Sequence, residues 1–334
     1  MAFDHYIPAS YLGRFSNDTD PMRRKRRLWV VDKRENLLTQ TTAGEICGEQ
    51  NFYTLSPKNQ DPRVVDSEWS GYENRLNPAL DNLIAGKLDA LDWLKTLVVF
   101  AAALLVRGRD FEARFDERFE GLYLPKHLNR DNTHMARLMD LQRLFASVIG
   151  ARWRLLETSG KNAQITNDLG YTPFMNPKLG ESGVAIPVSH KHILLVIACR
   201  KRIIAHALDG TWIPNIERSA LEDEAHAMFL SSIASCAQRY VIGSDDTAMR
   251  KYLKAEATPP PIPEPVMLGF LNSAMARHYE MMYFDCLTKF SSPPTGPNTQ
   301  VSVDYDKNMT DAIPESPLNS IQITRGQGRP PNEC

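Results

Sequence analysis

One long segment of the sequence consists of apolar residues without interruption. Leu97–Val106 is the longest uninterrupted apolar run in the chain, and charged residues stand close to both ends, with Lys95 before it and Arg107 after it. A membrane-spanning helix needs about 20 such residues, so this run predicts no membrane span. A helix that is hydrophobic all round has to be enclosed by other parts of the protein. We therefore expect a central helix over residues 91–119, with the rest of the chain packed around it.

Apolar residues that recur at intervals of three and four predict a helix on each side of the central one. The first covers residues 64–84 and contains Pro78, which can kink or divide it. The second covers residues 132–157. Together the three helices form a helical block over about residues 64–158.

Segments with strand character lie on both sides of this helical block. Before it, residues 28–31 and 37–42 flank a short turn and predict a hairpin, and residues 51–55 predict a third strand. After it, further elements are expected: strands over 163–166, 184–188, 193–198 and 240–242, a loop over 170–183, and helices over 216–238 and 246–256. This order predicts an α+β fold. A small, mostly antiparallel sheet is built from N-terminal and central strands, and the large helical block is inserted as a cap.

The domain organisation follows from changes in composition. Residues 1–257 are expected to form a single α+β domain. Residues 258–265 contain five prolines and predict a stiff linker. A final helix with an aromatic and methionine stripe is expected over residues 266–290. From residue 291 to 334, proline, asparagine, serine, threonine and glycine dominate, and we expect a disordered tail.

The charge of the whole chain is close to neutral. With a net charge of -1, the surface as a whole is not expected to bind nucleic acid without specificity. A basic run directly precedes the first predicted strand and consists of Arg23, Arg24, Lys25, Arg26 and Arg27. This run could contact a nucleotide or a nucleic acid, or it could be a solvated loop, and the second interpretation is favoured.

The cysteines and the start of the chain indicate a reducing compartment. None of the five cysteines forms a CxxC pair with another. The first residues also lack the basic and apolar regions of a secretory leader. We therefore expect free thiols and a cytoplasmic protein.

The first fifteen residues are unusually apolar for a chain terminus. Ile7 precedes Pro8 and is therefore biased toward an extended backbone, whereas Pro8 can open a helix at its first position. Tyr11, Leu12 and Phe15 follow at helical spacing and share one apolar face. We expect an extended entry followed by one or two helical turns, docked on the core.

This opening segment carries a resemblance to a known family. Its pattern is His-Tyr-Ile-Pro-x-x-Tyr-Leu-x-x-Phe, which is similar to the opening signature of the family catalogued as domain of unknown function 4238. Residues 28–33, 51–53 and 165–168 resemble later segments of that family and occur in the same order. The resemblance covers roughly the first 200 residues. It implies a shared fold and a shared candidate pocket, and it implies no activity.

Candidate site residues lie in or beside the segments that resemble the family. Those expected to act in catalysis are His5, Glu49 and Asp168, and those expected to bind a ligand are Arg107, Tyr53 and Tyr6. His5 can act as a base near neutral pH or as a ligand, and Asp168 follows a predicted strand, where sites are often placed. Arg107 could hold a phosphate or a carboxylate, or pair with Asp168 or Glu49. The alternative is that His5 packs in a docked terminus and Arg107 caps a helix.

Metal and cofactor signatures are weak. Asp66, Glu68 and Glu73, together with Asp168, could hold a divalent cation for phosphodiester hydrolysis, but a solvated helix face is the favoured interpretation. The sequence contains no HExxH, P-loop or GxGxxG motif. We therefore assign no metal ligand and expect no nicotinamide or flavin, while a divalent metal stays open as a cofactor.

Two hypotheses of function follow, from different classes. The first is a hydrolase or nuclease-like enzyme that acts on a phosphate-bearing substrate, such as a nucleotide or a nucleic acid, with His5 and Asp168 in acid-base or metal chemistry and Arg107 on the anion. The second is a non-catalytic interaction module that binds a protein partner or associates with a second copy as a homo-oligomer. We slightly favour the enzyme, because packing alone does not require a histidine in the opening motif.

Overall fold

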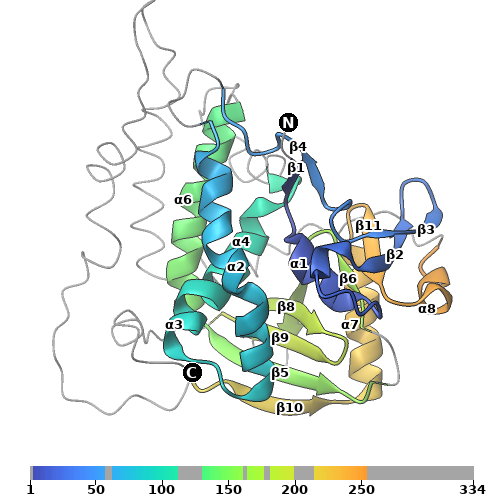
Figure 1. The fold of residues 1–334 in the computed structure, drawn as a ribbon. Coiled ribbons are helices and arrows are strands. Elements are labelled where there is room, and N and C mark those ends of the chain that lie inside the picture. The colour runs from blue at the N-terminus through green and yellow to red at the C-terminus, as the bar shows by residue number, and fades with distance from the viewer. Residues whose placement is uncertain are drawn as a thin grey trace, which may run out of the picture.

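The computed structural model describes residues 3–56, 62–111, 130–160, 164–176, 181–198 and 214–253. Within these residues, helices and strands occupy separate regions. Figure 1 shows a group of helices standing over a five-stranded sheet, with a smaller sheet beside them. The predicted α+β class is therefore confirmed.

The opening segment has the predicted conformation. β1 (Phe3–His5) is extended, α1 (Ala9–Leu12) follows Pro8, and a 3₁₀ turn, η1 (Gly13–Phe15), completes the helical part. β1 pairs antiparallel with β4 (Gly48–Gln50). The third strand predicted over residues 51–55 is wrong, because residues 51–53 form a turn instead. Asn51 takes a φ of 55° there, a left-handed conformation that asparagine tolerates better than most residues.

The expected small antiparallel sheet is present, but the strands predicted over 184–188 and 193–198 are not part of it and lie in a second sheet. Its order is β3-β2-β11-β6, and every neighbouring pair is antiparallel. The N-terminal hairpin supplies β2 (Arg27–Asp32) and β3 (Leu37–Thr42), as predicted. The central part of the chain supplies β6 (Thr166–Asn167) and β11 (Tyr240–Gly243).

A second, five-stranded sheet lies under the helices, in the order β10-β5-β9-β8-β7. Its strands are β5 (Arg152–Thr158), β7 (Thr172–Asn176), β8 (Glu181–Ser189), β9 (His192–Ile197) and β10 (Glu217–Leu221). Only the β10–β5 pair is parallel. The segments now seen as β5 and β10 were expected to be helical, and the one seen as β7 was expected to be a loop. In β5 the alternation of buried Trp153 and Leu155 with half-exposed Arg152 and Arg154 has the period of a strand.

The helices of the predicted block are present, with bounds that differ from the predicted ones. They are α2 (Val64–Ala85, with Pro78 inside), α3 (Ala90–Asp92), a π-helical turn η3 (Trp93–Val98), α4 (Val99–Arg107) and α6 (Arg130–Ile149). Every residue of α4 after Val99 is buried, so the predicted central helix is confirmed. It ends at Arg107 because Gly108 leaves the helical conformation, with a ψ of 157°. The predicted extension over residues 112–119 lies outside the described residues.

Two helices close the described part of the chain, α7 (Asp223–Cys236) and α8 (Asp246–Arg250). The predicted linker over 258–265, helix over 266–290 and tail over 291–334 lie outside the described residues, and the single domain over 1–257 stays a prediction. No helix in the described ranges is long and apolar enough to span a membrane.

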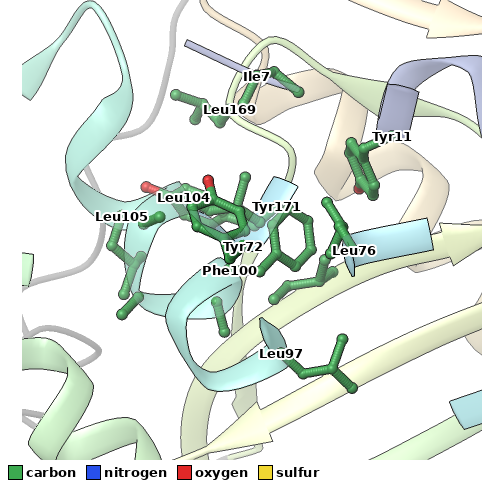
Figure 2. Close-up of a cluster of buried hydrophobic side chains, with 14 of the residues drawn as sticks. Ile7, Tyr11, Tyr72, Leu76, Leu97, Phe100, Leu104, Leu105, Leu169 and Tyr171 are labelled. Atoms are coloured by element: carbon green, nitrogen blue, oxygen red, sulfur yellow. The ribbon is translucent and has the colours of Figure 1, made fainter. Parts of the chain in front are cut away.

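The main core fills the space between the helices and the five-stranded sheet, and the opening segment is part of it. Figure 2 shows Ile7 and Tyr11 beside α4, where Tyr11 lies 5.1 Å from Phe100, measured between ring centroids. The hydroxyl group of Tyr11 donates to the carbonyl of Pro187 on β8 at 2.6 Å. The start of the chain is thus a buried element that joins α4 to the sheet.

Three helices end where a distant side chain meets their last carbonyl groups. Arg137 donates to the carbonyls of Val106 and Gly108 at the end of α4, at 2.6 and 2.9 Å. Arg218 donates to Leu83 and Ile84 at the end of α2. Lys33 donates to Ala234 and Ala237 at the end of α7, at 3.0 Å each. These contacts satisfy carbonyl groups that a helix cannot pair internally.

Gly170, in the turn between β6 and β7, tests how tightly the opening segment is packed. It has a φ of 75°, and a Cβ atom added there would lie 2.8 Å from Leu104 and 3.3 Å from Ile7. Gly170→Ala should therefore lower the free energy of unfolding by about 1–3 kcal/mol. Gly71→Ala is the matched control, because Gly71 lies in α2 with open space around it. It should raise stability by up to about 1 kcal/mol. Equal effects of the two substitutions in denaturant titrations would contradict the packing.

Candidate functional site

Three of the predicted site residues meet at the end of α4. The guanidinium group of Arg107 donates to the hydroxyl of Tyr72 at 2.5 Å, to the carboxylate of Glu73 and to the backbone carbonyl of His5. The hydroxyl of Tyr53 donates to the carbonyl of Arg107 at 2.8 Å. We refer to these five residues as the Arg107 cluster. It ties β1, α2 and the turn after β4 to one helix end.

Aromatic rings surround the cation of this cluster. The guanidinium carbon lies 5.0 Å from the ring centre of Trp69, 5.7 Å from that of Tyr53 and 5.9 Å from that of Tyr72. Burial opposes the charge, but Tyr72 and Glu73 raise the pKa of Arg107 above its ordinary value, so the side chain is a cation at every pH of interest. It is 2% exposed. An incoming phosphate would have to displace partners that the chain itself provides.

His5 is held in one tautomer. Its Nε2 atom lies 3.1 Å from the carbonyl of Gly44, which can only accept, so Nε2 carries the proton. Burial lowers the pKa of His5, which keeps the ring neutral near pH 7. Nδ1 is then the acceptor of the ring, and no described residue bonds it. In this form His5 can accept a proton.

Asp4 was not among the predicted site residues, although it is more deeply buried than His5. Its carboxylate accepts the backbone N–H of Tyr53 at 2.9 Å and forms an ion pair with Arg63 at 3.0 Å. The residue is 1% exposed. The sequence did contain a signal, because an acidic residue directly before the opening motif is unusual in a segment that is otherwise apolar. Asp4 holds the turn that carries Tyr53 against β1.

Asp168 belongs to a different part of the molecule. Its carboxylate accepts the backbone N–H groups of Gln238, Arg239 and Tyr240 at 2.9, 2.7 and 3.2 Å. The residue is 4% exposed, and burial raises the pKa of its carboxyl group to about 6 although the three amides act in the opposite direction. Lys33 donates to the carbonyls of Ala234 and Ala237, which precede these amides in the chain. Asp168 and Lys33 together therefore fix the connection from α7 to β11.

Tyr6 directly follows His5 in the chain, and the charge of Asp168 acts on its hydroxyl group. It is 3% exposed, and burial, the thiol of Cys47 and the charge of Asp168 all raise the pKa of its hydroxyl group. Cys47 is itself buried and has a φ of 54°. Burial raises the pKa of the Cys47 thiol, so it is a poor nucleophile. Tyr6 is therefore placed as a core residue, and a ligand would reach it only if the opening segment moved.

The predicted partners of Arg107 were wrong. Arg107 pairs with Glu73, whereas Glu49 pairs with Arg109 at 2.5 Å on the surface, where both side chains are 39% exposed. Asp168 is occupied by backbone amides. The reason is positional, because α2 passes directly beside the end of α4 and presents Glu73 there.

Some residues of the basic run form contacts with the rest of the fold, and the others are exposed. Arg23 pairs with Asp81 at 3.2 Å, and Nε of Arg26 donates to the carbonyl of Asp20 at 2.7 Å. Arg24, Lys25 and Arg27 are exposed. Three cations therefore remain for a contact with a nucleotide or a nucleic acid, which stays a prediction.

Three of the four acidic residues considered for a metal, Asp66, Glu73 and Asp168, are engaged elsewhere, and Glu68 is exposed. Asp66 pairs with Arg63 at 2.5 Å, and Glu73 pairs with Arg107. In the part of the chain that the structure describes, no group of three or more His, Cys, Asp or Glu side chains could hold a metal ion.

Replacement of Arg107 should show how much the cluster contributes to stability. Arg107→Met keeps most of the side-chain length but leaves Glu73 and the His5 carbonyl without their donor, and should cost about 3 kcal/mol of unfolding free energy. Arg109→Met removes an exposed ion pair and should cost at most about 1 kcal/mol. Chemical denaturation of both variants measures the difference. Losses of equal size would mean that the buried cluster contributes no more than a surface pair.

Ionisation of Asp168 should cost stability. The pKa of its carboxyl group is raised to about 6 in the folded chain, against about 3.9 in an unfolded chain. The protonated carboxyl group therefore makes its full contribution to the free energy of unfolding below about pH 3.9, and this contribution is lost as the pH rises through about 6. The unfolding free energy of the wild type minus that of Asp168→Asn should fall by about 1 kcal/mol between about pH 5 and about pH 7.5. A difference that rises over this range would show that the three amides stabilise the anion more than burial opposes it.

The comparisons with known proteins agree with the resemblance seen in the sequence. A family model described as "Protein of unknown function (DUF4238)" matches residues 4–247. No curated protein and no solved structure matches the chain. The matched residues include the opening segment, the Arg107 cluster, Asp168 and all the described strands except Phe3 of β1. Because the match covers well over half of the sequence, the chain belongs to the DUF4238 family.

Proposed function

We propose that the described part of this chain is a non-catalytic interaction module that acts by binding another protein surface. One observation carries the proposal, which is that two of the residues expected to perform chemistry, Arg107 and Asp168, are bound within the fold. The guanidinium of Arg107 and the carboxylate of Asp168 are at most 4% exposed, and both have partners from the chain itself. Groups in this condition stabilise a structure and are not free to bind a substrate.

The long-range character of these contacts supports the same proposal. Arg107 joins helix α4 to His5, a residue 102 positions earlier in the chain. Asp168 joins β6 to residues 70 to 72 positions later. Such contacts decide which elements lie side by side. The residues that define the opening motif then serve to build a rigid scaffold, and function lies on the surface of that scaffold.

A phosphate-directed hydrolase is the second candidate, and one observation favours it. His5 is neutral, has a fixed tautomer and keeps Nδ1 as an acceptor. Arg109 and Glu49 lie on the neighbouring surface as an exposed ion pair. A general base beside a cation suits attack on a phosphate ester. The candidate has no second group in position, since Asp168 and Arg107 are engaged elsewhere.

A ligand panel separates the two candidates. Thermal unfolding of the full chain would be followed with inorganic phosphate, nucleoside mono-, di- and triphosphates, Mg²⁺, Mn²⁺ and Zn²⁺, for the wild type and for His5→Asn. Asparagine cannot act as a base, and its shorter side chain does not extend to the position of Nε2, so the hydrogen bond to the Gly44 carbonyl is lost as well. We expect no ligand to shift the wild-type transition, and His5→Asn to differ by a constant offset.

The contrary outcome is equally clear. A ligand at a hundredfold excess over its dissociation constant stabilises the native state by about 2.7 kcal/mol, which is a shift of several degrees. A shift of this size in the wild type that is absent from folded His5→Asn would refute the interaction module and support the hydrolase. Arg250→Gln is the matched control for a loss of surface charge alone, because Arg250 belongs to an exposed ion pair in α8.

A further inference from the structure

The two larger sheets have four edge strands, and three of them are protected. β6 is only two residues long, β7 contains Pro173, and β10 begins with Glu217 and Arg218. Short length, proline and charge are the usual means by which proteins prevent the edge of a sheet from pairing with another chain. At each of these three edges, the strand therefore carries a feature that discourages pairing with another chain.

β3 is the exception. It is six residues long, Leu-Leu-Thr-Gln-Thr-Thr, without charge, proline or glycine, and it ends the four-stranded sheet on its outer side (Figure 1). Threonine favours strands, and Leu37 is 52% exposed. An unprotected edge of this kind is a template for strand addition.

Side-chain contacts at the end of β3 show which backbone groups point outward. The backbone N–H of Thr42 donates to the carboxylate of Glu45 at 3.1 Å, away from β2. Because the direction alternates along an antiparallel strand, Leu38 and Gln40 also direct their N–H and C=O groups outward. Glu45 occupies the edge at Thr42, so only these two residues are offered for pairing.

We propose that β3 pairs antiparallel with β3 of a second copy of this chain, about a two-fold axis at Thr39. The inference rests on the proposed interaction module and names its partner. Leu38 of each copy exchanges two hydrogen bonds with Gln40 of the other, and Thr39 faces its own counterpart across the axis. The two four-stranded sheets then become one continuous sheet.

The charges at the two ends of β3 favour a second copy over an unrelated strand. Arg34 and Glu35 are exposed at the turn before β3, and Arg24 and Glu45 are exposed near its end. The proposed register brings the turn of one copy to the end of β3 in the other. Arg34 then lies opposite Gly44, next to Glu45, and Glu35 lies opposite Ala43. Arg24 is close to that position, because its carbonyl accepts the N–H of Gly44 at 2.7 Å. Each end of the contact therefore brings Arg34 of one copy next to Glu45 of the other.

A cysteine at the axis tests the register directly. Facing residues without mutual hydrogen bonds have Cα atoms about 4.5 Å apart, which suits a disulfide. Mild oxidation of the full-length Thr39→Cys variant should therefore give a covalent dimer that a reducing agent splits. Thr41→Cys is the matched control, since Thr41 lies on the same strand and face but about 13 Å from its own counterpart. The wild type controls for its natural cysteines.

A charge at the axis tests the dimer in solution. Sedimentation of the wild type from about 1 to about 100 μM should show a reversible monomer–dimer equilibrium. Thr39→Lys places two like charges opposite each other and should raise the dissociation constant at least about tenfold. Ser219→Lys, on the exposed edge β10, should leave it unchanged. Unfolding curves confirm that both variants fold.

The outcomes separate this inference from the proposed function. A wild type that stays monomeric, or equal cross-linking of the Thr39→Cys and Thr41→Cys variants, overturns the β3 dimer and leaves an interaction module with a different partner. Only a ligand response that depends on His5 overturns the module itself. Selective cross-linking at residue 39, together with dissociation of Thr39→Lys, establishes the dimer.

Discussion

A helix that ends inside a protein leaves its last carbonyl oxygens without partners, and much of this chain is arranged to supply them. α4 is buried on all sides, so water cannot satisfy its end. Arg137 and Tyr53 do so instead, by donating to the carbonyls of residues 106, 107 and 108. Lys33 performs the same task for α7. Because an unsatisfied buried carbonyl costs about 1–3 kcal/mol, these contacts decide where each helix can stop.

The Arg107 cluster is a consequence of the same constraint. An apolar helix that ends in a buried arginine must provide partners for the cation, and a buried charge without them is strongly unfavourable. Glu73 neutralises it, and the carbonyl of His5 completes the contact. The start of the chain is thereby fixed beside α2. This explains why a terminal segment carries so many large apolar residues, since it is part of the core.

Prediction from the sequence succeeded where a pattern is local. The hairpin, the opening turn and the central helix each follow from residues within one segment. β5 was missed because Trp153 and Leu155 follow apolar residues of α6 at spacings that a helix also allows, and Gly150, where α6 stops, was not used. β10 was missed because an exposed edge strand has no apolar alternation.

The site was harder to predict because its partners come from distant segments. The structure brings His5, Tyr53 and Arg107 together. Glu73, Glu49 and Asp168 all carry the charge that could pair with Arg107. Only the path of α2 decides which of them reaches Arg107. Asp168 was placed correctly at the end of a strand. Its role follows from the connection between α7 and β11, and no feature of the sequence near residue 168 shows that connection.

The central claim is that buried polar side chains, remote in sequence, hold this fold together. Native-state hydrogen exchange at the amides of Gln238, Arg239 and Tyr240 tests it most directly, since these N–H groups lie in a connection between elements and are bonded to Asp168. The account predicts that they exchange only by global unfolding, with the same free energy as the amides of β2 and β11. Exchange by local opening, at the low free energy of an ordinary loop, would contradict it.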